Sequence, residues 1–584
     1  MANFFTDNED MQSLFEHMDL AKIAAIMEED FRFSTDYDHA PTDADDAIDN
    51  YKRILTALGE LCGDIIAPTA EDTDTSGNEL DQDGSVTRAD GIADAIKRLG
   101  QADLMGFTLP YRFGGLNCPN LVYAMSIDIV SRADAALMNI YGLQGIAETI
   151  NAFADDEIKQ QYLPKMASGQ WTGAMVLTEP DAGSDLQAVK TSGWQDAEGN
   201  WFVRGVKRFI TNGCGDVLLV LARSEPEMSD GRGLSLFLVE KGKGVHIRRL
   251  ENKLGIHGSP TCEIFFDDAP AKLIGERQRG LITYVMSLMN GARIGIAAQS
   301  LGIGEAAYRI ARDYAGKRKQ FDTAIENFPA VRELLVRSRI DLQAARTLTY
   351  FASFNVDIEN GALRRIEFGN IEDADLKKKL RKESRQYGRY NKVLTPMAKY
   401  YASEMSMRVS NDSIAVLGGS GYMKDYASER HLRDSRITTI YEGTSQLQIV
   451  ASVAGVISGT ATTIVEGILD GRANNWPEDT VPLIDQIREG LKILDTCIEH
   501  IKGAAGVQYR DLYARKLVDI AIYLVVASLF CDQAIANERM KIVARYWLAW
   551  RMPEIRMLAE QICSGDQSVV DDFEALAGAM PILQ

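Results

Sequence analysis

The segment NWFVRGVKRFITNG, residues 200–213, is rich in β-branched and aromatic residues and begins at the turn signal EGN. Five more segments of this kind surround it, separated by turns such as SDGRG: TGAMVLTE (172–179), DVLLVLARS (216–224), GLSLFLVEK (233–241), VHIRRLE (245–251) and CEIFFDDA (262–269). Short strands with regular turn signals are typical of all-β units. The pattern predicts a compact antiparallel β domain, built as a barrel or a sandwich.

The chain on both sides of this segment carries apolar residues at helical spacing, as in YKRILTALGELCGDII (51–66) and PAVRELLVRSRIDLQAARTLTYFASF (329–354). Long helices with one apolar face each form bundles. The sequence therefore predicts an α+β multidomain fold with four parts: an N-terminal helical domain (1–172), a middle antiparallel β-barrel or sandwich domain (173–280), a C-terminal four-helix bundle (281–455) and an extra C-terminal helical domain (456–584).

Two charged segments stand out. Residues 1–50 hold 14 acidic and 2 basic residues, which is typical of a solvated face or tail. The run ENGALRRIEFGNIEDADLKKKLRKE (359–383) reads as a charged insertion between two bundle helices.

Composition excludes several classes of protein. The 46% hydrophobic and 25% charged fractions are those of a soluble globular chain, and the net charge of −20 argues against nucleic-acid binding. We expect no membrane span, because we find no run of about 18 uncharged apolar residues. MANFFTDNEDMQ lacks the pattern of a secretion signal, so we expect a cytoplasmic protein. Seven cysteines without a CxxC pair and six scattered histidines predict no metal site.

Four short motifs could hold a ligand, but each has an ordinary structural explanation. One is GAMVLTEPDAGSDLQAV (173–189), which either binds a cofactor through its backbone or is an ordinary loop of the β domain. Another is GKRKQF (316–321), which either binds a pyrophosphate or is a solvated helix end. VKRFITNG (206–213) places an aromatic ring and a hydroxyl on one strand face, where they flank a flat ring or belong to the core. The fourth is LGGSGY (417–422), whose glycines either let a nucleotide approach the backbone closely or form an ordinary turn between helices.

A single carboxylate, Glu442, lies between a Tyr and a Gly in RDSRITTIYEGTSQLQI (433–449). The flanking residues read as helix, so we expect Glu442 on or beside a helix–helix connection. Most loop carboxylates are solvated and have no chemical role.

Together, TEPDAGSD, ITNG, KLGIHGSPTCEIFFDD, GARIGIAAQSLGIGEAAYRIARDYAGKRKQF, LGGSGY and the YEG element resemble the FAD-dependent acyl-CoA dehydrogenases over roughly residues 50–455. The appended helices are similar to those of the larger bacterial subgroup that includes 3-methylmercaptopropionyl-CoA dehydrogenase. The resemblance implies FAD, an acyl-CoA substrate and a homodimer. Electron-transfer flavoprotein is the implied acceptor. An acyl-CoA oxidase and a non-catalytic FAD-binding assembly protein of the same fold are the alternatives.

The resemblance makes Glu442 the catalytic base that removes the α-proton while the β-hydride passes to FAD, giving a trans-2-enoyl-CoA. A base for so weak an acid needs burial that raises its pKa. The backbone N–H of Glu442 and a ribityl hydroxyl of FAD would stabilise the developing enolate. Some relatives carry the base just before the arginine of NGAR; here that position is Ala292, which leaves Glu442 as the candidate.

The remaining site residues also follow from the resemblance. FAD would be bound by Leu177, Thr178, Ser184, Phe209, Ile210, Thr211, Thr444 and Gln446, with Arg318, Phe321, Gly418 and Gly419 acting across a subunit interface. The substrate would contact Ser184, Asn290, Arg293 and Gly443. Phe209 stands where the family usually has Trp, and Ala415 stands where many members have Gln. The sequence does not indicate which acyl group the substrate carries.

Overall fold

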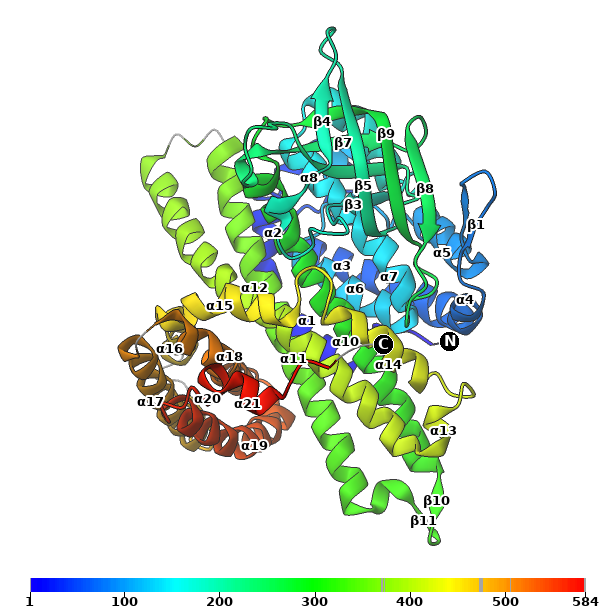
Figure 1. The fold of residues 1–584 in the computed structure, drawn as a ribbon. Helices are drawn as coiled ribbons and strands as arrows, with labels where there is room; N and C mark the ends of the chain where they lie inside the picture. The colour runs from blue at the N-terminus through cyan, green and yellow to red at the C-terminus, as the bar shows by residue number, and fades with distance from the viewer. Residues whose placement is uncertain (1, 369–370, 372, 472–475, 505, 582–584) are drawn as a thin grey trace.

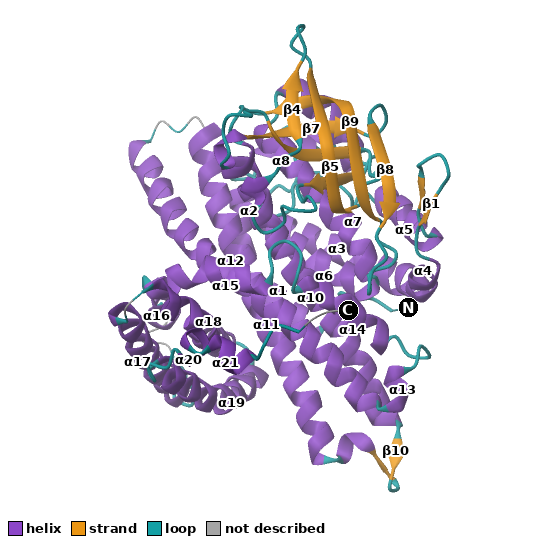
Figure 2. Cartoon of the chain, in the orientation of Figure 1, coloured by secondary structure: helices purple, strands orange, loops and turns teal. Residues whose placement is uncertain are grey.

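A computed structural model describes residues 2–581 apart from 369–370, 372, 472–475 and 505. Helices surround a twisted sheet at one end of the molecule and continue as a bundle to the other end (Figures 1 and 2). A further group of helices lies beside the bundle. This arrangement confirms the α+β fold with an N-terminal helical domain, a β-rich middle domain and helical C-terminal domains.

The N-terminal region is helical, as expected, with one short hairpin that the sequence did not indicate. Its helices are α1 (Glu9–His17), α2 (Leu20–Met27), α3 (Ala44–Leu61), α4 (Ala70–Ser76), α5 (Asp90–Gln101), α6 (Asn120–Ala133), α7 (Ala135–Gly142), α8 (Ile146–Phe153) and α9 (Asp156–Ala167). The hairpin pairs β1 (Glu79–Leu80) with β2 (Val86–Thr87). Helix α6 is buried along nearly its whole length, including the polar Asp128 and Arg132, because it packs on both α10 and α11.

The middle region forms one sheet that closes on itself. Its strands are β3 (Gly173–Val176), β4 (Ser192–Gln195), β5 (Trp201–Thr211), β6 (Val217–Arg223), β7 (Leu234–Glu240), β8 (Val245–Leu250) and β9 (Thr261–Ile274). Pairings β6–β7, β7–β9, β9–β5, β5–β4 and a bridge between β4 and β6 complete a ring, with β3 and β8 at its margins. The sheet is not purely antiparallel, because β3 enters from the helical domain and pairs with β6 in parallel.

Three long helices form the bundle: α10 (Met286–Lys317), α11 (Pro329–Phe368) and α12 (Ala374–Leu417). The fourth side is taken by the shorter α13 (Gly419–Tyr422), α14 (Ser428–Thr438) and α15 (Ser445–Ile457) rather than by a fourth long helix. The expected insertion at 359–383 is instead the ends of α11 and α12, which run beyond the bundle as a helical hairpin. Its residues 369, 370 and 372 lie outside the described residues.

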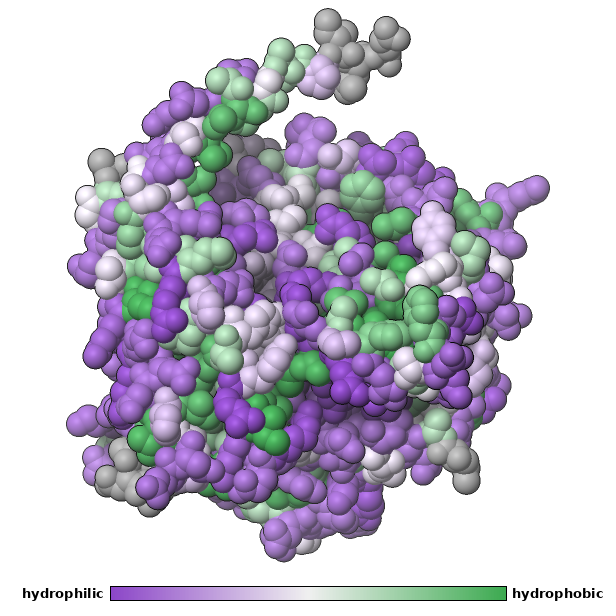
Figure 3. All heavy atoms as spheres, turned by 90° about the horizontal axis from the view of Figure 1, so that it is seen from below, coloured by the Kyte–Doolittle hydropathy of each residue, from purple (hydrophilic) through white to green (hydrophobic). Residues whose placement is uncertain are grey.

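The appended region consists of α16 (Thr460–Asp470), α17 (Val481–Gly503), α18 (Val507–Gln533), α19 (Glu538–Ile562), α20 (Ser568–Asp571) and α21 (Phe573–Ala577). Helix α18 is buried along most of its length, because α15, α16, α17 and α19 all pack on it. The last described residues, 571–581, are exposed throughout. Seen from below in Figure 3, the bundle end of the molecule shows hydrophobic patches between hydrophilic side chains.

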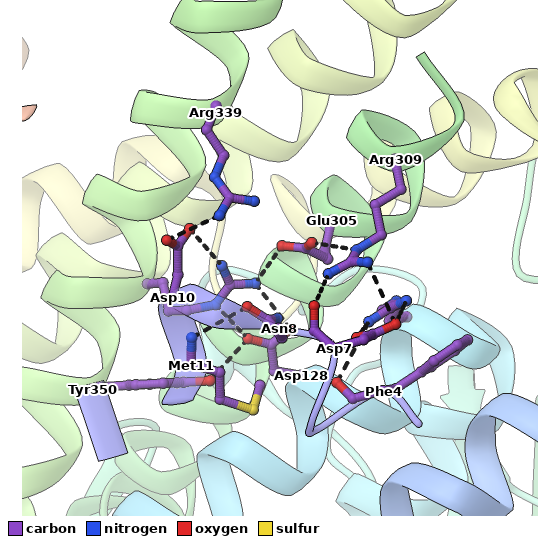
Figure 4. Close-up of polar contacts among 12 residues, drawn as sticks. Phe4, Asp7, Asn8, Asp10, Met11, Asp128, Glu305, Arg309, Arg339 and Tyr350 are labelled. Carbon is purple, nitrogen blue, oxygen red and sulfur yellow. Dashed lines mark hydrogen bonds and ion pairs between the residues drawn. The ribbon is translucent and has the colours of Figure 1, made fainter. Parts of the chain in front are cut away.

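Most acidic side chains of residues 1–50 are exposed, as expected of a solvated face, but Asp7 and Asp10 form ion pairs with the rest of the molecule. Asp10 in α1 pairs with Arg339 at 3.0 Å (Figure 4). Asp7 pairs with Arg132 at 2.7 Å, and Asp10 also pairs with Arg539 of α19 at 3.1 Å. The Asp10 side chain is fully buried. Carboxylates can be buried when cations surround them, so these acids anchor the N-terminal arm, residues 2–18, to the bundle and the appended region.

One described helix, Gly280–Lys317, is long and apolar enough to cross a membrane, and the bent pair of α15 and α16 passes the same test. This corrects the expectation that the sequence offers no candidate span. Because 44% of the apolar window is buried and α10 packs on α6, α11 and α12, the helix belongs to the core of the bundle.

Candidate active site

Glu442 lies in the connection between α14 and α15, where the sequence places it. Glu442 and Gly443 both have positive φ, at 54° and 89°. A left-handed conformation at a glutamate is strained and persists only when neighbours hold it. Two side chains hold the connection through its carbonyls: Lys399 Nζ donates to the Gly443 oxygen at 2.7 Å, and Gln448 Nε2 donates to the Glu442 and Gly443 oxygens at 3.1 and 2.9 Å.

The outgoing helix is fixed at its first turn. Thr444 caps α15 by accepting from the Leu447 N–H at 3.3 Å, and the Ser445 hydroxyl donates to Glu404 at 2.6 Å. Within the described residues, the Glu442 N–H has no hydrogen-bond acceptor. The turn therefore presents free backbone donors, among them the N–H of Glu442 itself.

The environment of Glu442 favours its neutral form. Burial raises the pKa of Glu442 to about 7, although the nearby cations Lys399 and Arg293 act in the opposite direction. Burial also lowers the pKa of Lys399 to about 7, against the attraction of Glu442 and Glu404. A carboxyl group that titrates near neutrality matches the requirement for a general base.

The incoming side of the connection is anchored to the N-terminal and middle domains. Tyr441 donates to Gln299 of α10 and to Asn139 of α7. In α14, the buried Asp434 accepts from the Ile256 N–H at 2.5 Å, and burial raises the pKa of Asp434 to about 7. The Glu442 connection is thus positioned by three domains together.

A buried ion pair between the loop and strand β5 fixes the TEPDAGSD loop. Lys207 of β5 donates to the Leu177 oxygen at 2.8 Å and pairs with Glu179 at 3.0 Å. Lys207 is fully buried, which lowers its pKa to about 8. The loop therefore sits rigidly on β5, with Leu177 buried and Thr178 partly exposed.

Phe209 is presented to solvent by a β-bulge rather than by simple alternation. The register of β5 against β9 shifts between Lys207 and Ile210, and Phe209 has φ 61°. An extra residue at a bulge turns a side chain outward. Phe209 is 54% exposed and Thr211 is partly exposed, whereas Ile210 between them is buried.

The other expected ligand contacts fall into two groups. Ser184, Asn290 and Gln446 are exposed, and Arg293 is partly buried, with Nη1 on Asn290 at 3.1 Å and a buried Nε without a described partner. A second group lies at the far end of the bundle (Figure 1). Arg318 directly follows α10, Phe321 lies in the turn between β10 (Lys319–Gln320) and β11 (Thr323–Ala324), and Gly418 and Gly419 lie at the start of α13. This second group is remote from the Glu442 connection in the same chain.

Comparison with known proteins gives the class. Three family models match consecutive parts of the chain: the N-terminal domain of acyl-CoA dehydrogenase at residues 50–170, the middle domain at 174–269 and the C-terminal domain at 279–368 and 378–456. The chain belongs to the acyl-CoA dehydrogenase family, whose members are FAD-dependent oxidoreductases. The predicted family, enzyme class and cofactor are thereby confirmed.

Individual relatives refine this picture. The chain is 36% identical to an acyl-CoA dehydrogenase of Bacillus subtilis over 62% of its own length and 90% of that protein. It is 32% identical to 3-methylmercaptopropionyl-CoA dehydrogenase of Ruegeria pomeroyi over 69% of each chain. The crystal structure of an acyl-CoA dehydrogenase complexed with FAD from Bacillus anthracis superposes over 92% of both chains with a TM-score of 0.75 at 23% identity, which shows the fold.

Lys399, Gln448, Lys207 and Glu179 were missed by the sequence reasoning, although they hold the two loops. Lys399 interrupts the apolar run LTPMAKYYA (394–402) of α12, and its helical spacing did not show that its face is buried. A lysine inside an apolar helical stripe was the only available signal.

Proposed function

We propose that the protein dehydrogenates an acyl-CoA thioester at the α,β-carbons, with Glu442 as the base that removes the α-proton. The observation that carries this proposal is a partly exposed carboxyl group, whose pKa burial raises to about 7, on a strained turn beside a free backbone N–H. The carboxylate would take the proton, and the N–H would donate to the thioester oxygen as negative charge develops there.

The residues on the β domain suit a flat cofactor. Phe209 offers an exposed ring, and Thr178 and Thr211 offer partly exposed hydroxyl groups. The Lys207–Glu179 pair keeps the Thr178 loop in place. When bound, FAD supplies the acceptor for the β-hydride. Phe209, Thr178 and Thr211 would hold the flavin, and Glu442 would act on the acyl-CoA bound with it.

The far-end residues support a homodimer in which each subunit completes the cofactor site of the other. Phe321 is 91% exposed at the tip of the β10–β11 hairpin, and Tyr422 is 76% exposed beside Gly418 and Gly419. A side chain added at either glycine would meet no atom within 4 Å, so a ligand can approach this backbone closely. Arg318 would then bind the pyrophosphate of FAD held by the second subunit.

We assign Arg293 and Asn290 to the binding of CoA. The charge of Arg293 interacts with that of Glu442, and its buried Nε has no described hydrogen-bond partner, so it is free to donate to a ligand. Electron-transfer flavoprotein is the proposed acceptor. Rapid reoxidation of substrate-reduced enzyme by air would favour an oxidase instead.

The first test is the variant Glu442→Gln under anaerobic conditions. We expect the variant to keep FAD and bind acyl-CoA, but to lose about a thousandfold in the rate of flavin bleaching, because proton abstraction is removed. A panel of short, long, branched and thioether acyl-CoAs, tested on the wild-type protein, identifies the substrate. Normal bleaching by the variant would exclude Glu442 as the base.

A further inference from the structure

A cavity of about 380 Å³ lies between the bundle and the appended helices. Helices α11 and α12 form one wall, and α18 and α19 form the other. Its charged lining includes the carboxylates of Asp341, Glu404, Asp412, Asp519 and Glu554 and the guanidinium group of Arg551. Five carboxylates face three guanidinium groups in all, so the cavity carries an excess of negative charge.

Only some of these carboxylates are neutralised within the protein. Asp341 pairs with Arg408 at 2.7 Å and with Arg551 at 3.1 Å, and Glu554 pairs with Arg551 at 2.7 Å. In contrast, Glu404, Asp412 and Asp519 form no ion pair within 4 Å among the described residues.

Two of these three carboxylates, Asp519 and Asp412, are in an environment that disfavours their ionised form. Burial raises the pKa of Asp519 to about 6 despite the hydrogen bond from Tyr400 at 2.9 Å and the charge of Arg515. Burial also raises the pKa of Asp412, against the charges of Arg337 and Arg408. A buried carboxylate without an adjacent cation is destabilised, so a cation that enters from solvent gains a favourable partner.

The aromatic walls already hold cationic groups. The Arg551 guanidinium lies 3.6 Å from the centre of the Trp550 ring and 4.4 Å from that of Tyr523, and Arg515 lies over Tyr400 at 5.3 Å. Ring faces attract cations, most strongly where water is excluded. In addition, Arg551 is 5% exposed, and its Nε lacks a described hydrogen-bond partner. A ligand oxygen could accept from this group.

We propose that this cavity is a binding site for a small aliphatic amine. Its ammonium group lies among Glu404, Asp412 and Asp519, against the rings of Tyr400 and Trp550. An oxygen on the same ligand accepts from Arg551 Nε. A basic amino acid carries both groups, whereas a diamine carries only the ammonium part.

The site is connected to the Glu442 turn through α12. The Glu404 carboxylate that lines the cavity accepts from Ser445, three residues after Glu442. Tyr400 follows Lys399, which holds the Gly443 carbonyl. An ammonium group on Glu404 competes with the Ser445 hydroxyl for the carboxylate, so occupancy changes the rate of flavin reduction. This coupling rests on the proposed function, but binding itself does not.

The test is titration calorimetry of the intact FAD-loaded protein with cadaverine, lysine and glutamate. We expect both amines to bind, lysine more tightly because its carboxylate reaches Arg551, and glutamate not to bind. Asp519→Asn and Glu404→Gln should each weaken amine binding about tenfold. The matched control, Asp485→Asn, removes a charge from a side chain that is 67% exposed on α17, and it should change nothing. Circular dichroism verifies that each variant is folded.

Absence of binding by both amines would overturn the proposal, as would equal weakening by the control variant. Flavin reduction is then measured with and without bound amine. A changed rate supports the coupling, and an unchanged rate overturns it while leaving the site in place. If no acyl-CoA bleaches the flavin, the proposed function is contradicted. The amine site is unaffected by that result, because calorimetry measures amine binding without any turnover of acyl-CoA.

Discussion

Lys399 is the residue whose chemistry is most tightly linked to that of Glu442. Its buried ammonium group favours the ionised carboxylate and also fixes the Gly443 carbonyl. The two groups have pKa values of about 7, so they titrate as a pair. Glu442 works as a base only when ionised, so the rate of flavin reduction should rise with pH through neutrality.

Replacing Lys399 by Met removes the positive charge that lowers the pKa of Glu442. We expect the acid limb of the pH–rate profile to move up by about one pH unit, with a lower rate at pH 7. Stopped-flow measurement of flavin bleaching from pH 5 to 9 checks this expectation. Lys399→Arg, which retains the charge, should leave the acid limb no higher than in the wild type. An unchanged profile in Lys399→Met would show that the lysine only supports the loop.

The sequence could indicate Glu442 but not its supporting residues. Glu442 is marked by its immediate neighbours in the YEG element, so the sequence alone can indicate it. Whether Lys399 is buried depends on how α12 packs against α15, which lies some 45 residues further along the chain. The pairing of Lys207 with Glu179 likewise depends on the position of β5 beneath the loop.

Among the elements, the β10–β11 hairpin is unusual because its two turn residues are Phe321 and Asp322, both with positive φ. Asn and Gly are favoured in such turns. A bulky aromatic side chain is retained there at a conformational cost, which fits a role for its ring outside its own subunit.

Phe321→Ala should therefore leave the subunit stable but weaken the assembly with FAD. We expect the free energy of unfolding of the apoprotein to change by less than about 0.5 kcal/mol, and FAD retention during gel filtration to fall. Ile542→Ala, at a side chain that is 60% exposed on α19, is the matched control and should retain FAD. A monomeric wild-type protein in light scattering would contradict the shared site.

The elements themselves were predictable wherever periodicity was strong, as in the strands of the middle domain and the start of α11. The charged run 359–383 was misjudged because these helix ends, although the end of α11 packs on α2, carry no continuous apolar stripe. Without that stripe, charged residues read as a loop even where helix propensity is high. The parallel pairing of β3 with β6 depends on how the preceding helices position β3. No local sequence pattern predicts that position.

At the scale of the whole molecule, the N-terminal arm joins parts that are distant in sequence. Asp10 lies beside Arg339 and Arg346 of α11 and Arg539 of α19, and His17 contacts Asp532 of α18 at 3.0 Å. Arg346 also pairs with Asp128 and Glu305, so each charge at the centre of this network has more than one partner.

Asp10→Asn should destabilise the protein by about 3 kcal/mol, the lower end for breaking a buried ion pair, because Arg346 keeps two other carboxylates. Urea unfolding measures the change. The neighbouring Glu9 is exposed, so Glu9→Gln should change the free energy of unfolding by less than about 0.5 kcal/mol. Equal effects of the two variants would mean that the network does not hold the arm.

The arm also constrains the order of folding during synthesis. Residues 2–18 are synthesised before the rest of the described chain, yet Asp10 and His17 find partners more than 500 positions later, on α19 and α18. Domains otherwise fold in sequence as they emerge. The dehydrogenase core can therefore assemble while its own beginning is still undocked. A large tag at the N-terminus would interfere with this final closure rather than with the formation of the core.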